Sequence, residues 1–256
     1  MSENLKIKKI LVAQPKPEAA KSPYFDLEEK MDVHVDFKPF TKVEGVSAKE
    51  FRQTRIQILE HTAIIFTSRT AIDHFFRICQ EMRITVPDMM KYFCISEATA
   101  FYLQKYIVYR KRKIFSANGN FSDVIDLMKK HKDDKFLVPL SHIHNKEIPD
   151  LLDKASYNYT KAIFYRTVSI DLSELKEVVD YDVLVFFSPS AITSLITNFP
   201  EFEQNDIKIA AFGNTTAAAV VEAGLRLDIE VPTPEAPSMI MALEQYIKHH
   251  NKAKAK

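Results

Sequence analysis

Four short turns rich in hydroxyl side chains are the parts of this chain best suited to chemistry. They are residues 67–70 (Thr-Ser-Arg-Thr), 96–99 (Ser-Glu-Ala-Thr), 188–190 (Ser-Pro-Ser) and 213–216 (Gly-Asn-Thr-Thr). Each follows an apolar run that predicts a buried strand and precedes a predicted helix. The first turn of a helix has unpaired N–H groups and the positive end of the helix dipole, which favour carboxylates. Ordinary N-capping would explain any one turn, but four turns in two repeated pairs predict a site for a ligand with several acidic groups.

The remaining motifs offer little catalytic machinery. The chain has no P-loop or Gly-x-Gly-x-x-Gly pattern and only four glycines, so dinucleotide binding is not expected. His142 and His144 lack a third ligand at helical spacing, which favours a solvated loop over a metal site. The basic run 109–113 stands in a chain of net charge +1, which argues against a nucleic-acid partner. Cys79 and Cys94 have apolar neighbours and are expected to be buried thiols without a disulfide.

The turns recur because the chain repeats a strand–helix pattern. Residues 64–72 return as 184–192, and residues 91–100 return as 208–217, in the same order. A chain of 256 residues is long enough for two such α/β units. Alternating strands and helices predict two parallel-sheet, helix-covered lobes of flavodoxin-like type. Ligands of such sheets bind beyond the carboxyl ends of the strands, where the four turns fall.

The first lobe is expected to be discontinuous. Residues 9–13 predict a strand that belongs with the C-terminal repeat, and Pro39 predicts an exposed strand, because proline cannot donate to a central ladder. This exposed strand and a second one within residues 161–168 would pair as a two-stranded antiparallel β-ladder that acts as a hinge. The expected division is lobe one, residues 1–32 with 169–256; the connecting β-ladder, 33–44 and 161–168; and lobe two, 45–160.

Several motifs keep a specific order between residues 10 and 247. They are Phe-Thr-Ser at 66–68, Phe-Tyr-Arg-Thr at 164–167, Phe-Phe-Ser-Pro-Ser-Ala at 186–191, Ala-Ala-Phe-Gly-Asn-Thr-Thr-Ala at 210–217 and Pro-Thr-Pro-Glu-Ala at 232–236. In this order the chain resembles the uroporphyrinogen-III synthase family. The resemblance implies a closing cleft, no metal or prosthetic group, and cyclisation of the linear tetrapyrrole hydroxymethylbilane. The product would be uroporphyrinogen III, formed with loss of water and inversion of ring D through a spiro-pyrrolenine intermediate.

The resemblance also implies roles for single residues. Tyr165 becomes the candidate proton donor to the leaving hydroxyl, with plain packing on the hinge strand as the alternative. The implied contacts to the substrate are Thr67, Ser68, Ser188, Ser190, Asn214, Thr215 and Thr216. The family's Thr-Arg-Pro-like turn reads Ala-Gln-Pro-Lys-Pro at 13–17, so Lys16 is the expected substitute for the arginine. Glu97 would repel an acidic substrate unless it points away.

Two classes of function stay open at this point. One is the cyclising enzyme, and the other is a two-lobed, non-catalytic sensor or binding module for a small polyanion. The first residues lack the apolar core of a signal peptide, and no apolar run approaches the roughly 18 residues of a membrane span. We therefore expect a cytoplasmic monomer that binds a small molecule, and neither nucleic acid nor membrane.

Overall fold

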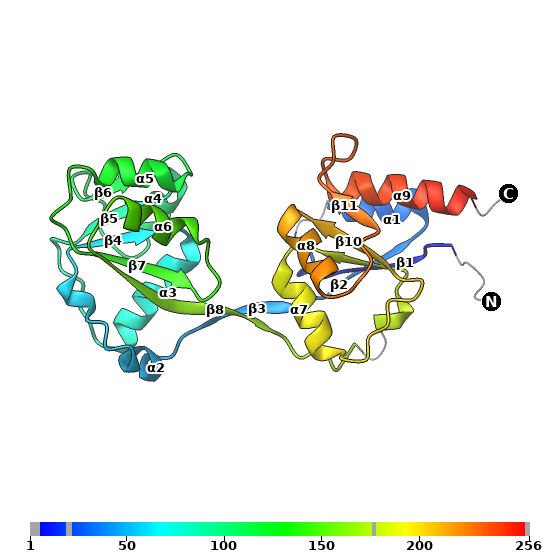
Figure 1. The fold of residues 1–256 in the computed structure, drawn as a ribbon, viewed down its shortest axis with the longest axis horizontal. Helices are drawn as coiled ribbons and strands as arrows, with labels where there is room; N and C mark the ends of the chain where they lie inside the picture. Colours follow the sequence, from blue (N-terminus) through cyan, green and yellow to red (C-terminus); the bar gives the residue numbers. More distant parts are fainter. Residues whose placement is uncertain (1–5, 19–21, 176–177, 254–256) are drawn as a thin grey trace. The chain divides into compact units, whose positions relative to one another are not determined.

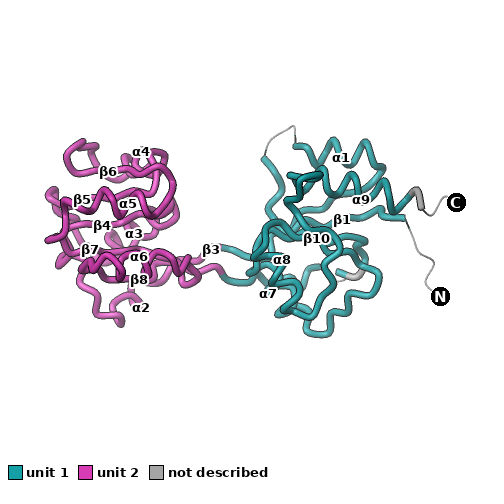
Figure 2. The backbone as a smooth tube through the Cα atoms, turned by 45° about the horizontal axis from the view of Figure 1, so that its top comes forward, with its two compact units in different colours: residues 1–42, 168–256 teal, residues 43–167 magenta. Residues whose placement is uncertain are grey.

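The computed structural model describes residues 6–18, 22–175 and 178–253. Residues 1–5, which the signal-peptide expectation includes, lie outside this part. The chain divides into two compact units, residues 1–42 with 168–256 and residues 43–167 (Figure 2). Each unit contains a largely parallel sheet with helices packed on it (Figure 1). The predicted α/β fold with two helix-covered parallel sheets is therefore confirmed. Within the described residues, no helix is both long and apolar enough to span a membrane.

The sheet of the first unit is built from both ends of its sequence. Its order is β11-β10-β9-β1-β2, and every neighbouring pair is parallel. The strands are β1 (Lys9–Val12), β2 (His34–Phe37), β9 (Val183–Phe186), β10 (Lys208–Phe212) and β11 (Ile229–Val231). Ile10 and Val12 pack toward α1 (Pro23–Met31) and α9 (Met239–Ala253). Leu11 packs toward α7 (Pro189–Asn198) and α8 (Asn214–Glu222), so helices cover both faces.

The second unit has a six-stranded sheet of order β3-β8-β7-β4-β5-β6. Its strands are β3 (Thr41–Gly45), β4 (Ala63–Phe66), β5 (Lys91–Cys94), β6 (Ile114–Ser116), β7 (Phe136–Ser141) and β8 (Tyr159–Ser169). Its α-helices are α2 (Ala48–Gln53), α3 (Arg69–Glu81), α4 (Glu97–Leu103), α5 (Phe121–Met128) and α6 (Glu147–Lys154). Single 3₁₀ turns occur at η1 (Ile58–Glu60) in this unit and at η2 (Val178–Asp180) in the first unit.

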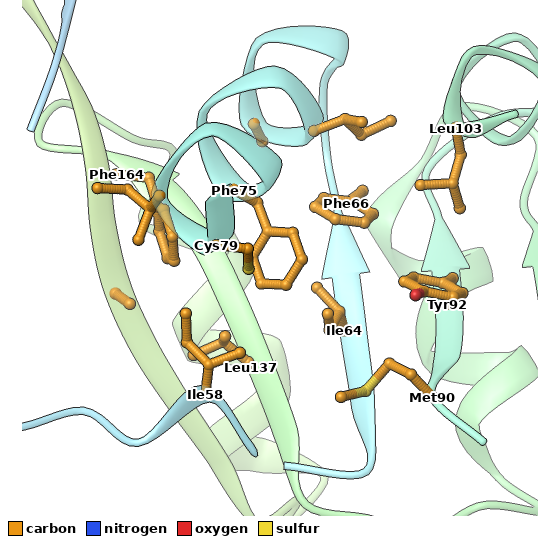
Figure 3. Packing of buried hydrophobic residues seen from close by; sticks show 14 of the residues in the cluster. Ile58, Ile64, Phe66, Phe75, Cys79, Met90, Tyr92, Leu103, Leu137 and Phe164 are labelled. Carbon is orange, nitrogen blue, oxygen red and sulfur yellow. The ribbon is translucent and has the colours of Figure 1, made fainter. Parts of the chain in front are cut away.

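A dense aromatic core anchors α3 to the second sheet. The Phe75 ring on α3 lies 5.5 Å from the Phe66 ring of β4 and 5.7 Å from the Phe164 ring of β8, between centroids (Figure 3). All three side chains are fully buried. Burying one such side chain stabilises the fold by about 1.5–3 kcal/mol. The middle of α3 is therefore held firmly against β4 and β8.

The chain passes between the units within β3 and β8, which are neighbours in the second sheet. The Ile170 N–H donates to the Phe40 carbonyl and the Val46 N–H to the Phe164 carbonyl, each at 3.0 Å, in an antiparallel register. The expectation that residues 33–44 run as one ladder strand differs from the structure. β2 instead pairs in parallel with β1, because Val33 and Val35 are buried in the core of the first unit.

Candidate active site

Ser68 and Tyr165 form the centre of the candidate site in the second unit. Ser68 follows β4 and is the N-cap of α3, where its Oγ accepts a hydrogen bond from the Ala71 N–H at 3.0 Å. The Tyr165 Oη lies 3.2 Å from the same Oγ, so the two hydroxyls share a proton in one direction or the other. The capping bond leaves the Ser68 hydroxyl with a proton to donate and a further lone pair. A phenol and an alcohol thus meet at the carboxyl end of the sheet.

A β-bulge aims Tyr165 at this position. Neighbouring side chains of a regular strand point to opposite faces of the sheet. Between β7 and β8 the register shifts: Leu140 pairs with Ile163, whereas Ser141 pairs with Tyr165. Phe164 and Tyr165, although consecutive, therefore both contact α3, through Phe75 and His74. Bulges commonly re-aim a side chain beside a functional site, and here the extra residue turns the phenol toward Ser68.

Arg69 adds a positive charge next to Ser68. Arg69 belongs to the first hydroxyl-rich turn, where the sequence analysis quoted it without giving it a role. Its guanidinium lies over the Tyr102 ring, 5.4 Å from the ring centre. The Tyr102 hydroxyl is in turn 2.9 Å from both carboxylate oxygens of Asp73, which holds the ring in place. No carboxylate in the described part of the chain pairs with Arg69. A cation in the first turn opposes the helix dipole, so its place here favours a role in binding an anion.

Ser141 is a second residue that the sequence analysis did not assign. It ends β7, in register with Tyr165, and is only 9% exposed. Its Oγ has no hydrogen-bond partner within the described residues, an uncommon state for a buried hydroxyl. The sequence signal was a serine at the end of the fully apolar run 136–140.

In the first unit, the predicted residues gather at the carboxyl ends of β1, β9 and β10, which are neighbours in the sheet. Ser188 is the N-cap of α7, but its side chain makes no capping hydrogen bond, and Ser190 is half-buried in the first turn. Asn214 and Thr215 are exposed at the start of α8. The exposed Lys16 has its Nζ 5.9 Å from the centre of the Phe25 ring. These side chains can bind carboxylates at one edge of this sheet.

Thr216 differs from its neighbours, because it is only 1% exposed. Thr216 lies in the first turn of α8 with its side chain hidden from solvent, so a substrate contact by Thr216 stays a prediction. An aromatic pair stands beside these polar residues instead. The Phe187 and Phe212 rings stack at 5.7 Å between centroids, and Phe212 is 36% exposed at the end of β10. This apolar surface among the hydroxyls was not predicted from the sequence.

The structure thus places Thr67, Ser68 and Tyr165 in the second unit and Lys16, Ser188, Ser190, Asn214, Thr215 and Thr216 in the first. Glu97 is exposed at the start of α4. The described residues contain no group of three or more His, Cys, Asp or Glu side chains placed to hold a metal ion. Cys79 and Cys94 are free and buried. Burial raises the pKa of each thiol to about 12, so neither is an efficient nucleophile near neutral pH.

A cavity of about 470 Å³ lies near the amino ends of β5 and β6 in the second sheet. It is lined by residues that precede β5 and β6, among them Met90 and Lys113, and by Cys79 and Tyr106. Because Ser68 and Tyr165 lie at the carboxyl ends of the strands, this cavity is not part of the candidate site.

The fold and these two groups of residues define a class: two-unit α/β proteins with hydroxyl-rich helix starts at the carboxyl ends of their parallel strands. The family model for uroporphyrinogen-III synthase HemD matches residues 26–241. The chain therefore belongs to the uroporphyrinogen-III synthase family. It is 23% identical over 260 residues to uroporphyrinogen-III synthase of Chlorobaculum parvum, which covers 94% of this chain and 100% of the relative.

Solved structures share the fold. The uroporphyrinogen-III synthetase of Helicobacter pylori aligns with a TM-score of 0.58 at 18% identity, covering 95% of this chain and 100% of that one. A mutant uroporphyrinogen III synthase of Thermus thermophilus aligns with a TM-score of 0.54 at 14% identity, covering 96% and 99%. Family membership makes the chain an enzyme of tetrapyrrole biosynthesis that cyclises hydroxymethylbilane. It also favours this activity over the non-catalytic binding module.

Proposed function

We propose that Tyr165 donates the proton with which the terminal hydroxyl of hydroxymethylbilane leaves as water. The observation that carries this proposal is the Tyr165 hydroxyl at 3.2 Å from the Ser68 Oγ, beside a strand end. Ser68 can donate to the phenolate that remains and so stabilise it. Proton transfer from one positioned side chain typically contributes about 100- to 10,000-fold to a rate.

The rest of the proposed reaction relies on the substrate's own electrons. As the C–O bond breaks, the nitrogen of the same pyrrole supplies the electron pair and keeps its proton, and an azafulvenium cation forms. The substituted carbon of ring D attacks it and forms the spiro-pyrrolenine. That intermediate fragments and recloses with ring D inverted, and a proton lost on aromatisation returns to the phenolate. One water leaves in total, so the protein needs chiefly to fold and hold the chain.

The acidic side chains of the substrate are held, in this proposal, by groups from both units. Lys16, Ser188, Ser190, Asn214 and Thr215 bind carboxylates at the first sheet, and Thr216 orients the first turn of α8. Thr67, Ser68 and Arg69 bind further carboxylates at the second sheet. The stacked Phe187 and Phe212 rings offer an apolar face for a pyrrole ring.

The connection between the units is proposed to act as a hinge. Two hydrogen-bonded strands, β3 and β8, cross the boundary together, so bending at this ladder would change the distance between the two groups of residues. We further propose that the enzyme works as a monomer in the cytoplasm.

The test is an assay with hydroxymethylbilane that is generated enzymatically in the same vessel. Oxidation of the products and chromatography separate the type III from the type I porphyrin. We expect type III to predominate with the intact chain. A mixture that contains only type I, the spontaneous product, would contradict the proposal, and heat-denatured protein serves as the control.

A further inference from the structure

Tyr165 rests on an imidazole ring from the next turn of α3. The rings of His74 and Tyr165 are 5.2 Å apart between centroids and only 16° from parallel, an offset stack. The Tyr165 hydroxyl, at the other end of the ring, meets Ser68 on the same helix cap. The phenol is therefore contacted on its face and at its tip by residues of one rigid helix.

The orientation of His74 is itself determined by Arg77. The Arg77 Nε donates to the His74 Nδ1 at 3.3 Å, which makes Nδ1 an acceptor and leaves the imidazole proton on Nε2. Arg77 also donates through Nη1 to the Glu81 carboxylate at 2.5 Å and through Nη2 to the Val46 carbonyl at 2.6 Å. Burial first, and then the Arg77 charge, lower the pKa of His74, which favours the neutral imidazole near pH 7.

Gly45 leaves the space that this arrangement needs. A Cβ at position 45 would lie 2.5 Å from the Arg77 Nη2 and 2.7 Å from the His74 Nδ1. Both distances are below van der Waals contact, so a side chain there would displace one of the two. The glycine thus permits close approach of a backbone to the His74–Arg77 pair.

These contacts form a closed ring of residues. From Tyr165 they run to His74, to Arg77 and to the Val46 carbonyl, and the Val46 N–H returns to the carbonyl of Phe164, the residue before Tyr165. We propose that His74 and Arg77, with Gly45 leaving room for them, form a clamp that positions the Tyr165 hydroxyl. They are positioning residues and act only through Tyr165; the inference rests on the proposed role of that tyrosine.

Kinetics of matched variants test the clamp. We expect His74→Leu and Gly45→Ala to lower kcat by about 5- to 50-fold and to change KM by less than about 2-fold, since misplacement by about 1 Å can cost 100-fold. His74→Phe keeps a flat ring against Tyr165 and should recover most of the loss. Arg77→Gln should resemble His74→Leu. Arg52→Gln, which removes an exposed arginine from α2, is the control for charge.

The decisive measurement is a double-variant comparison. Since the clamp acts through the phenol hydroxyl, His74→Leu should cost no further activity in a Tyr165→Phe background. An equal loss in both backgrounds, or an unchanged kcat in His74→Leu, would overturn the proposal. A loss in Arg52→Gln as large as in Arg77→Gln would overturn it as well. Circular dichroism checks the fold, and His74→Phe keeps the test valid if Gly45→Ala does not fold.

A second readout separates the clamp from the catalytic role of Tyr165. In protein labelled with ¹³C at the tyrosine Cζ, the Tyr165 resonance is the one that disappears in Tyr165→Phe. Loss of the stacked imidazole in His74→Leu should shift this resonance, whereas Arg52→Gln should not. An unmoved resonance refutes the clamp geometry. Full activity of Tyr165→Phe instead refutes the proposed proton donation and, with it, the catalytic purpose of the clamp.

Discussion

At the scale of single residues, the candidate hydroxyls of the two units differ in the hydrogen bonds that they already make within the protein. Ser68 caps α3 and also meets Tyr165, whereas the Ser188 side chain makes no capping bond. Removing the Ser68 hydroxyl therefore changes both a helix cap, worth about 1 kcal/mol, and the contact to the phenol. Because the Ser188 side chain makes no capping bond, we expect its substitution to change substrate binding without changing the stability of the helix.

Tyr165→Phe is the direct test of the proton donor. We expect kcat to fall by about 100- to 1000-fold, within the range that one positioned proton donor contributes. The ring and its stack on His74 remain, so the melting temperature should change little. The rate of type III formation and a thermal melt measure the two effects. An unchanged kcat would leave Tyr165 with a packing role only.

Arg69→Gln tests the proposed carboxylate contact beside Ser68. A charge-assisted hydrogen bond contributes about 1.5–3 kcal/mol, and solvent screening reduces this at an exposed site. We therefore expect KM to rise by roughly 3- to 10-fold with little change in kcat, and the difference from the wild type to shrink at high salt. Arg52→Gln is the matched control. Equal KM values for the two variants would exclude a specific contact.

At the scale of elements, the buried carboxylate of Asp134 joins segments at the amino end of the second sheet. The Asp134 carboxylate accepts hydrogen bonds from the Lys91 Nζ at 2.6 Å and the Thr62 Oγ1 at 2.7 Å. Burial alone would raise the pKa of Asp134, but the hydrogen bonds from Lys91 and Thr62 hold it below its ordinary value. Stability from this group is therefore present above the unfolded pKa of about 3.9 and is lost as the pH falls through the lower folded pKa.

Asp134→Asn should accordingly lower the free energy of unfolding by about 1–3 kcal/mol at pH 7. The deficit relative to the wild type should shrink below about pH 4, where the wild-type carboxylate also becomes neutral. Urea unfolding between pH 3 and pH 7 measures both quantities. Asp126→Asn is the control, because Asp126 pairs with Lys129 on an exposed surface and such pairs contribute little. A deficit independent of pH would contradict this account.

At the scale of the whole molecule, the proposed mechanism requires residues of both units to bind one ligand. Bending at β3 and β8 should then bring the units together when a polycarboxylate binds. We expect saturating uroporphyrin III to reduce the radius of gyration in small-angle X-ray scattering, and acetate at equal carboxylate concentration to leave it unchanged. Fluorescence of the porphyrin establishes saturation. A radius that stays constant in the saturated protein would refute the hinge.

The strand-end positions of several candidate residues could be predicted because strand ends are visible in a sequence. The buried strands and the turns after them placed Thr67, Ser68, Ser188, Asn214 and Thr215 correctly at the carboxyl ends of parallel strands. Arg69, Ser141 and the Phe187–Phe212 pair were not predicted as site residues. Their significance depends on neighbours distant in the chain, such as Tyr102 beneath Arg69.

The sequence by itself determined the α/β class and the duplication, because strand and helix periodicity and the order of motifs are local properties. It also determined family membership, confirmed by the match over residues 26–241. Only the tertiary structure decided that β2 leaves the connecting ladder for the first sheet, and that a bulge turns Tyr165 toward Ser68. Register and side-chain direction follow from pairing between segments about 25 residues apart in these cases, and no local pattern encodes them.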